Sequence, residues 1–340
     1  MAILNLASIV KPILYADYGK LSSLEKNSLV TSGLAYTHPV IQAGIMGGGD
    51  SINLPYWNDL DYAEPTPATD NPDDKIVANT ITGSKDVAFK YPYAKSISSS
   101  KLAIDWAGSD PAGQFDSLLN EFWQKHLQRV ITNTCQGLFA DSVTNHYNDL
   151  VLDISAGDAD EVVVADNYMD GDNFLGALGE LGDRQMDITS VGMHSTVFGN
   201  LNIANQIDVV RDSDQNAMFY TYKGKRVILD DKMFSVTYGD PQKVKYTTIL
   251  FGKNVFGFGA GSSKMTPLAY VRDELGGNGS GTDTVISRRQ YMLHPVGYSF
   301  DGASMAENAP TLAELADGTM WTRNFTERKR IQMVGIISNG

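Results

Sequence analysis

The segment from Ser109 to Ser142, SDPAGQFDSLLNEFWQKHLQRVITNTCQGLFADS, constrains the fold more than any other part of the chain. Its apolar side chains recur every three or four residues, at Phe115, Leu118, Leu119, Phe122, Leu127, Val130, Ile131, Cys135, Leu138 and Phe139. This period predicts an amphipathic helix with one sustained apolar face, with Gln124, Lys125, Gln128, Arg129 and Asn133 on the other. Asp110 is a suitable N-cap and Pro111 a suitable first helical residue.

From Pro111 to about Asn145 such a helix would be roughly 50 Å long, at about 1.5 Å per residue. Helices in globular proteins average only about 11–12 residues. A single long helix in a chain otherwise broken by Gly and Asp indicates a need for length and stiffness more than for a pocket.

Composition and charge limit the classes of function. With 42% hydrophobic residues over 340 positions, the chain can bury a large core and is not predicted to be disordered. Its net charge of −13 opposes the phosphate neutralisation on which duplex DNA binding depends. No apolar run of about 18 residues predicts a membrane span, and the N-terminal residues do not indicate export. The lone Cys135 is expected to be a small buried hydrophobe in a protein made in a reducing cytoplasm.

Ahead of the long helix, the sequence predicts extended structure. Residues 50–57 form an extended segment, with Pro55 favouring a sheet edge, and the Pro- and acid-rich residues 58–75 form a solvated loop. A hairpin is expected over residues 75–94, turning at Gly83-Ser84. Its second strand alternates in polarity, so one face would carry Val87, Phe89, Tyr91 and Tyr93.

Beyond residue 150, strands alternate with helices, which predicts an α/β or α+β domain over about residues 150–280. The expected elements are a helix at 174–184, a strand at 187–195, a helix at 196–205 and a strand pair at 223–236 and 245–259. Later elements are a long strand at 285–300, a short capped helix at 309–321 and a terminal strand at 329–340.

The motifs that could carry chemistry fail on their spacing. DNYMDGD has Tyr168 at the third ligand position of a calcium loop and Ala177 at the twelfth, so an acidic turn is favoured. GFGAGSSK lacks the phosphate-binding order of Gly, Lys and Ser/Thr, so a flexible connection is favoured. None of the five histidines has a partner at zinc-ligand spacing, and Asp230-Asp231 fits a turn better than an acid–base pair. No catalytic, cofactor or metal site is therefore expected.

The order of these elements resembles the major capsid proteins of tailed bacteriophages with the Hong Kong 97 coat-protein fold. The segments that carry the likeness are GGGDSINLPYWNDL, TGSKDVAFKYPYAKSI, LAIDWAGSDPAGQFDSLLNEFWQKHLQRVI, ITSVGMHSTVFGNLNI, YKGKRVILDD, RRQYMLHPVGYSF and LAELADGTMWTRNFTERKRIQMVGIISNG. The resemblance implies an α+β fold in five parts: an N-terminal arm (1–55), an extended E-loop (56–100), a P-domain with the spine helix (101–149), an A-domain (150–280), and a return to the P-domain with the terminal strand (281–340).

The same resemblance implies a function in the virion. Pentamers and hexamers would assemble into an icosahedral shell enclosing double-stranded DNA, inside the host bacterial cytoplasm. The partners would be other copies of the chain, a separate scaffolding protein and a portal, with no cofactor and no membrane. The face formed by Val87, Phe89, Tyr91 and Tyr93 would pack on a neighbouring subunit, so Phe89→Asp or Tyr91→Asp should leave a folded subunit that forms no closed shell. No intersubunit Lys–Asn crosslink is expected.

Two rival interpretations remain open at this stage. An encapsulin-like nanocompartment shares the fold but encloses enzymes in a small shell, so particle diameter and contents distinguish it. A soluble α/β enzyme with an unrecognised site would instead remain a monomer or small oligomer.

Overall fold

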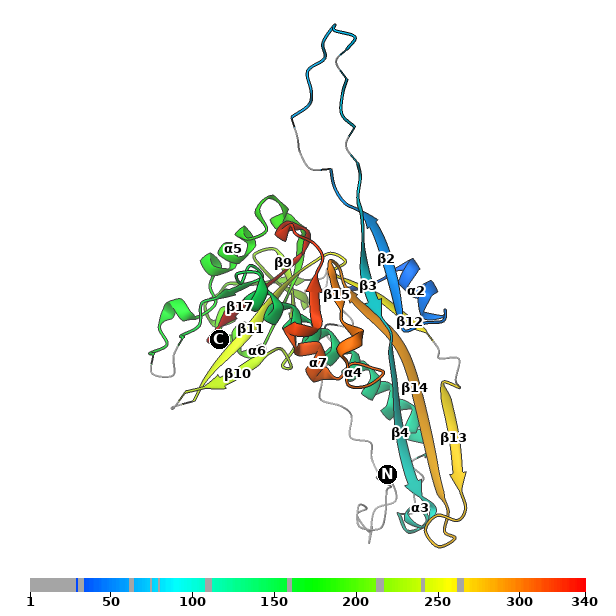
Figure 1. The fold of residues 1–340 in the computed structure, drawn as a ribbon. Coiled ribbons are helices and arrows are strands. Elements are labelled where there is room, and N and C mark those ends of the chain that lie inside the picture. The colour runs from blue at the N-terminus through cyan, green and yellow to red at the C-terminus, as the bar shows by residue number, and fades with distance from the viewer. Residues whose placement is uncertain are drawn as a thin grey trace.

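The computed structural model describes residue 29 and residues 34–60, 64–73, 75–78, 80–107, 112–157, 161–211, 217–239, 242–261 and 266–340. Its outline is elongated: a long sheet runs down one side, a broader sheet lies beside it, and a thin loop projects far beyond both (Figure 1). The expected Asp110 cap and Pro111 lie outside the described residues, as does most of the predicted N-terminal arm.

The predicted long helix is present as α4 (Ala112–Asn145), which has 34 residues. Its first half packs on one side only and leaves Asp116, Leu118 and Asn120 exposed. Its second half, from Val130 to Ser142, is enclosed on nearly all sides. The expectation of a single apolar face is therefore wrong for that half, because Thr132, Thr134, Asp141 and Ser142 are also buried.

A five-stranded sheet, which we call the long sheet, supports the first half of α4. The 14-residue strand β14 (Thr282–Pro295) pairs along one edge with β4 (Tyr91–Ser100). Its other edge pairs with β12 (Phe256–Gly261) and then with β13 (Leu268–Asp273). The short strand β1 (Ala35–Thr37) continues the sheet beyond β12. Strands β12 and β13 thus belong to the long sheet, although the sequence analysis grouped them with the strands of the central sheet in one domain at 150–280.

An eight-stranded sheet, which we call the central sheet, forms the second half of the molecule. Its order is β5-β17-β11-β6-β9-β8-β7, with β10 paired to β11. The bounds are β5 (Val151–Asp153), β6 (Ile188–Met193), β7 (Ile207–Arg211), β8 (Ala217–Tyr222), β9 (Lys225–Leu229), β10 (Ser235–Tyr238), β11 (Lys243–Gly252) and β17 (Met333–Ser338). The segment 223–236, predicted to pair with 245–259, contains two strands: β10 begins within it and pairs with β11 as expected, whereas β6 lies between β9 and β11. The C-terminal strand inserts beside β11, so the chain ends inside this sheet.

Short helices cover the sheets and close the core. They are α2 (Pro39–Ile45), α3 (Lys101–Ala107), α5 (Gly171–Gly179), α6 (Ser195–Ile203) and α7 (Leu312–Ala316). The helix expected at 174–184 is α5 followed by the 3-10 helix η2 (Gly182–Asp187). The predicted cap of α7 is confirmed: Thr311 and Glu314 form a reciprocal capping box.

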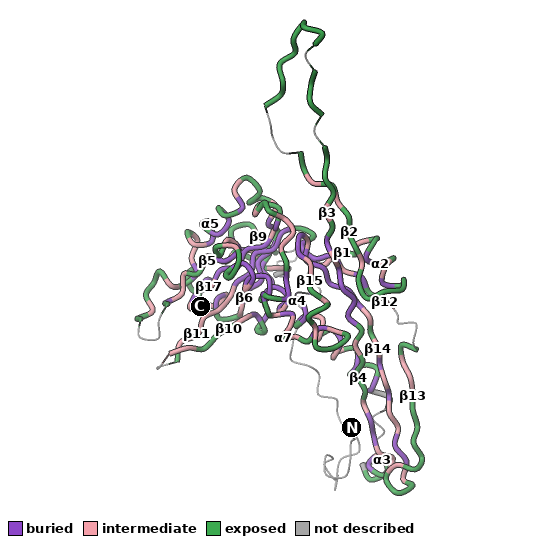
Figure 2. The backbone as a smooth tube through the Cα atoms, in the orientation of Figure 1, coloured by how far each residue is buried: buried purple, intermediate pink, exposed green. Residues whose placement is uncertain are grey.

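One large cluster of buried side chains joins the two sheets through α4. It includes Ile131 and Leu138 from the helix, Tyr291 from the long sheet, and Phe251 and Met333 from the central sheet. Figure 2 shows the buried residues concentrated around this region, while the described residues of the projecting loop are exposed. Cys135 is buried in the same cluster, as predicted, and this burial raises the pKa of its thiol.

Glycines permit the close packing around the second half of α4. A Cβ on Gly137 would overlap the carbonyl oxygen of Leu315 in α7 and lie 2.5 Å from Trp321 Nε1. The Trp321 indole N–H in turn donates to the Leu315 carbonyl, at 2.9 Å. In the segment that packs on α4, a Cβ on Gly318 would lie 2.5 Å from the backbone nitrogen of Asp141.

We therefore expect Gly137→Ala to destabilise the unassembled subunit by about 1–3 kcal/mol, because overpacking forces α7 away from α4. Gly199→Ala is the matched control, since Gly199 is also helical but a Cβ there meets nothing within 4 Å. That control should be neutral or stabilising by up to about 1 kcal/mol. Urea denaturation of both variants measures the difference, and equal midpoints would contradict the packing argument.

Candidate assembly interface

The projecting loop is carried by a two-stranded ribbon, β2 (Ser51–Trp57) and β3 (Gly83–Phe89). The two strands pair antiparallel, from Ser51 opposite Phe89 to Trp57 opposite Gly83. The hairpin predicted at 75–94 is therefore displaced. Gly83 does not turn the chain but begins a strand, and the connection is the long loop at 58–82. The predicted extended segment at 50–57 and the predicted loop at 58–75 are present at their expected positions.

Every described residue from 59 to 82 is exposed. Several of them are large and apolar, although the surrounding loop is rich in proline and acids: Leu60 (58% exposed), Ile76 (78%), Val77 (84%) and Ile81 (63%), with Trp57 (77%) at the end of β2. Apolar side chains in a Pro-rich acidic loop were the signal that sequence analysis missed. They give the loop an exposed apolar surface that no other described part of the subunit covers.

A buried polar network holds the root of the ribbon. The Asp86 carboxylate accepts hydrogen bonds from the Asn324 side chain at 2.7 Å and from the Gly297 backbone N–H at 3.2 Å. His294 Nε2 lies 3.5 Å from the same carboxylate. The Ser299 hydroxyl accepts from the backbone N–H of Val87 and from Asn324. Buried polar groups hydrogen-bonded in this way favour one geometry, so β3 leaves the body at a defined angle.

Contacts further along the ribbon stiffen the start of the loop. Tyr56 packs edge-to-face on Phe325, with ring centroids 5.4 Å apart. Arg330 donates to the Asp59 carboxylate at 2.9 Å. The other side of the ribbon packs on α2, where Ile41 and Ile45 meet Ala88 of β3. Within the described part of the predicted arm, α2 and β2 thus pack against their own subunit.

The four predicted interface residues occupy different positions from those expected. Phe89 and Tyr91 are 7% and 1% exposed and belong to the main core of their own subunit. Val87 and Tyr93 are half-buried. The alternating pattern is real, but it faces α4 and β15 (Tyr298–Phe300) of the same chain. Phe89→Asp or Tyr91→Asp would therefore disrupt the subunit core, and the expectation that either leaves a folded subunit is wrong.

Val87 and Phe89 nevertheless border an open groove in which part of another chain could lie. Together with Phe300 they line an open groove of about 580 Å³ at the root of the ribbon, where Asp50 and Asp301 also lie. This groove and the loop surface are places near the ribbon at which another chain could be accommodated.

Tyr93 joins an aromatic cluster around His126 of α4. The Tyr93 and His126 rings meet edge-on at 4.7 Å, and Phe122 stacks on His126 at 6.0 Å. His126 Nε2 is buried and has no hydrogen-bond partner. Burial, and to a lesser extent the nearby Arg129, lowers the pKa of His126 below its ordinary value. This histidine packs as a neutral ring among aromatic side chains.

This lowered pKa makes stability depend on pH. Because the folded pKa is depressed, the unfolded chain binds the proton first, so His126 should reduce stability as the pH falls below about 6.5. His126→Phe keeps an aromatic ring but cannot titrate. We expect its loss of urea resistance between about pH 7 and pH 5 to be smaller than that of the wild type, and parallel curves would contradict the assignment.

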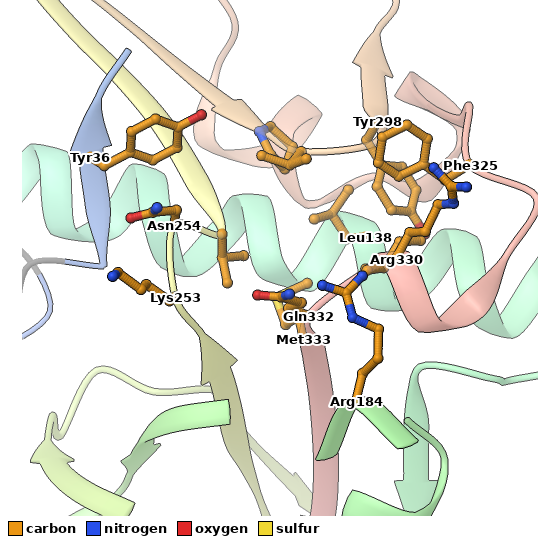
Figure 3. Close-up of a pocket in the computed structure, with 14 residues that line it drawn as sticks. Tyr36, Leu138, Arg184, Lys253, Asn254, Tyr298, Phe325, Arg330, Gln332 and Met333 are labelled. Atoms are coloured by element: carbon orange, nitrogen blue, oxygen red, sulfur yellow. The ribbon is translucent and has the colours of Figure 1, made fainter. Parts of the chain in front are cut away.

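A cavity of about 310 Å³ lies at the seam between the two sheets (Figure 3). Arg184 and Lys253 border it on the central-sheet side, and Leu138 of α4 and Tyr298 border it on the other. Its described lining contains no carboxylate, histidine, serine or cysteine. The lining therefore offers neither a pair of catalytic carboxylic acids nor a Ser or Cys nucleophile with a histidine base.

The motif candidates have structural roles. The glycines at 257, 259 and 261 are not a flexible connection but lie in β12. A Cβ on any of them would come within 3 Å of Ile41 or Ile45, so they let α2 pack closely on the strand. The Lys264 of this motif lies outside the described residues. Asp170 caps α5 by accepting from the Asn173 N–H, and Asp230 accepts from the Lys232 N–H in a turn.

Two features are absent from the described residues. No group of three or more potential ligands among His, Cys, Asp and Glu is placed to hold a metal ion. None of the described helices combines the length and the apolar character that crossing a membrane requires.

Comparison with known proteins agrees with this architecture. The model of the Gp13-like family, described as major capsid protein 13-like, matches residues 48–334. The major capsid protein of Bacillus phage SPP1 is 32% identical over 331 residues, covering 97% of this chain and 96% of that protein. The chain therefore belongs to the Gp13-like family of major capsid proteins.

Solved structures show the same fold at low sequence identity. The capsid asymmetric unit of cyanophage Pam1 aligns with a TM-score of 0.58 at 11% identity, over 99% of this chain and 98% of that one. The capsid of Ralstonia phage GP4 gives 0.58 at 10% identity, over 97% and 96%. The predicted α+β fold of Hong Kong 97 type is confirmed, and so is the function of major capsid protein of a tailed phage. Neither rival interpretation is favoured.

Proposed function

We propose that this capsid protein forms pentamers and hexamers that close into an icosahedral shell around double-stranded DNA. The observation that carries the proposal is the projecting loop, which presents exposed apolar side chains on a ribbon with a fixed root. An isolated two-stranded ribbon is marginal in water. Burying its apolar tip on an adjacent copy would contribute about 25 cal/mol for each Å² of apolar surface removed from water.

Different segments of the chain would have different roles in the shell. Residues 56–100 act as the E-loop, α4 is the spine of the P-domain, and the central sheet is the core of the A-domain. The protein acts through its surfaces and catalyses no reaction.

Other partners follow from the same function. A separate scaffolding protein would set shell size, a portal would occupy one vertex, and assembly would take place in the host bacterial cytoplasm. The net charge of −13 supports an inner wall that does not adhere to DNA, because like charges let the genome move during packing.

The loop makes the proposal testable. Ile76→Asp combined with Val77→Asp should leave the subunit folded, with an unchanged Tm, because both side chains are exposed in it. Closed shells should be lost, since each buried isoleucine or valine is worth about 1.5–3 kcal/mol and the contact recurs throughout a shell. Electron microscopy and sedimentation of the variant, coexpressed with neighbouring genes, provide the measurement.

The matched control is Thr66→Asp combined with Ala68→Asp, which adds the same charge to exposed polar or small residues of the same loop. It should assemble at wild-type yield. If the Ile76/Val77 variant also forms normal shells, the loop surface is not an assembly contact. Wild-type protein that stays monomeric with all its partners present would instead refute the shell itself.

A further inference from the structure

The turn after α4 holds a tyrosine in an unusual position. Tyr147 is fully exposed, at 102% of its reference area, and makes no ring contact or hydrogen bond among the described residues. Its φ is +54°, and that of the next residue, Asn148, is +60°. Asparagine tolerates the left-handed region, but a bulky aromatic residue there is an outlier. Two features of Tyr147 are therefore energetically unfavourable in the isolated subunit: the strained backbone and the exposed aromatic ring.

The surrounding structure forces this conformation. Ser142 is fully buried, and its carbonyl accepts from the backbone N–H groups of His146 and Asn148 at 3.0 Å. Its hydroxyl donates to the Asp149 carboxylate and accepts from the Leu150 N–H at 2.9 Å. These bonds fix the chain on both sides of Tyr147, so the turn cannot relax without breaking them.

Two arginines also hold the turn in place through Asp149. Arg323, whose side chain is 4% exposed, pairs with the Asp149 carboxylate at 2.6 Å. Arg328 donates to the Asp149 carbonyl at 2.7 Å. Burial lowers the pKa of Arg328 to about 10, which leaves it charged at neutral pH. Strained residues persist only where their surroundings over-determine them, and they concentrate at functional sites.

We propose that Tyr147 is a pre-organised anchor that inserts into a second copy of this chain during shell assembly. Tyrosine is among the residues that dominate protein interfaces, and a backbone that is already fixed loses less conformational entropy on binding. Two copies that each carry a net charge of −13 repel one another, so a neutral aromatic contact is a suitable means of association. The inference rests on the proposed function, since it requires that copies of the chain meet.

Substitution separates an assembly role from a folding role. Tyr147→Asn suits the left-handed backbone and removes the ring, so its Tm should equal or exceed that of the wild type. Its yield of closed shells, when coexpressed with neighbouring genes, should fall at least tenfold. Tyr147→Phe is the control: it keeps the ring and should assemble at wild-type yield. Normal shells from Tyr147→Asn would overturn the proposal while leaving the shell function intact.

A photo-crosslinking residue at position 147 identifies the partner. Irradiated particles should contain a covalent product of twice the 37.0 kDa subunit mass, absent from unassembled subunits. A product of any other mass would assign the anchor to a different protein, and no product would show that the residue remains free in the shell. Either result would refute insertion into a second copy.

Discussion

The enclosure of the second half of α4 is the constraint on which the rest of the structure depends. Val130 and Ile131 are buried against side chains from both sheets. Gly137 lets α7 lie close to α4, where the Trp321 indole N–H donates to the Leu315 carbonyl. A helix enclosed in this way cannot rotate or shift without disturbing both sheets. The long sheet, the central sheet and the C-terminal segment are therefore all held in place by α4.

The ribbon and its loop follow from this rigidity. The root of β3 is fixed by the Asp86 network, which draws on Gly297, Ser299 and Asn324 of the return segment. That segment in turn packs on α4 through α7 and β16 (Trp321–Arg323). The direction in which the loop leaves the subunit is thus set by residues more than 200 positions away in sequence. The loop itself is exposed and depends on a partner to bury its apolar side chains.

The same return segment connects the loop with the turn that carries Tyr147. Arg323 and Arg328 hold Asp149 at the end of α4, while Arg330 pairs with Asp59 at the start of the loop. A short run of arginines therefore positions two proposed contact regions of the subunit. Their ion pairs differ in burial: Arg323 is enclosed, whereas Arg330 and Asp59 are exposed and screened by solvent, so the first contributes more to defining geometry.

The sequence by itself determined the elements with strong local signals. The three- and four-residue period predicted α4, the pattern at 309–321 predicted a short capped helix, and proline with acids predicted the exposed loop. Only tertiary structure decided which faces are covered. A period of two shows that Val87, Phe89, Tyr91 and Tyr93 share a face, but not whether that face meets its own core or a neighbour. Likewise, Gly257, Gly259 and Gly261 resemble a flexible linker until Ile41 packs on them, because helix–strand approach depends on residues distant in sequence.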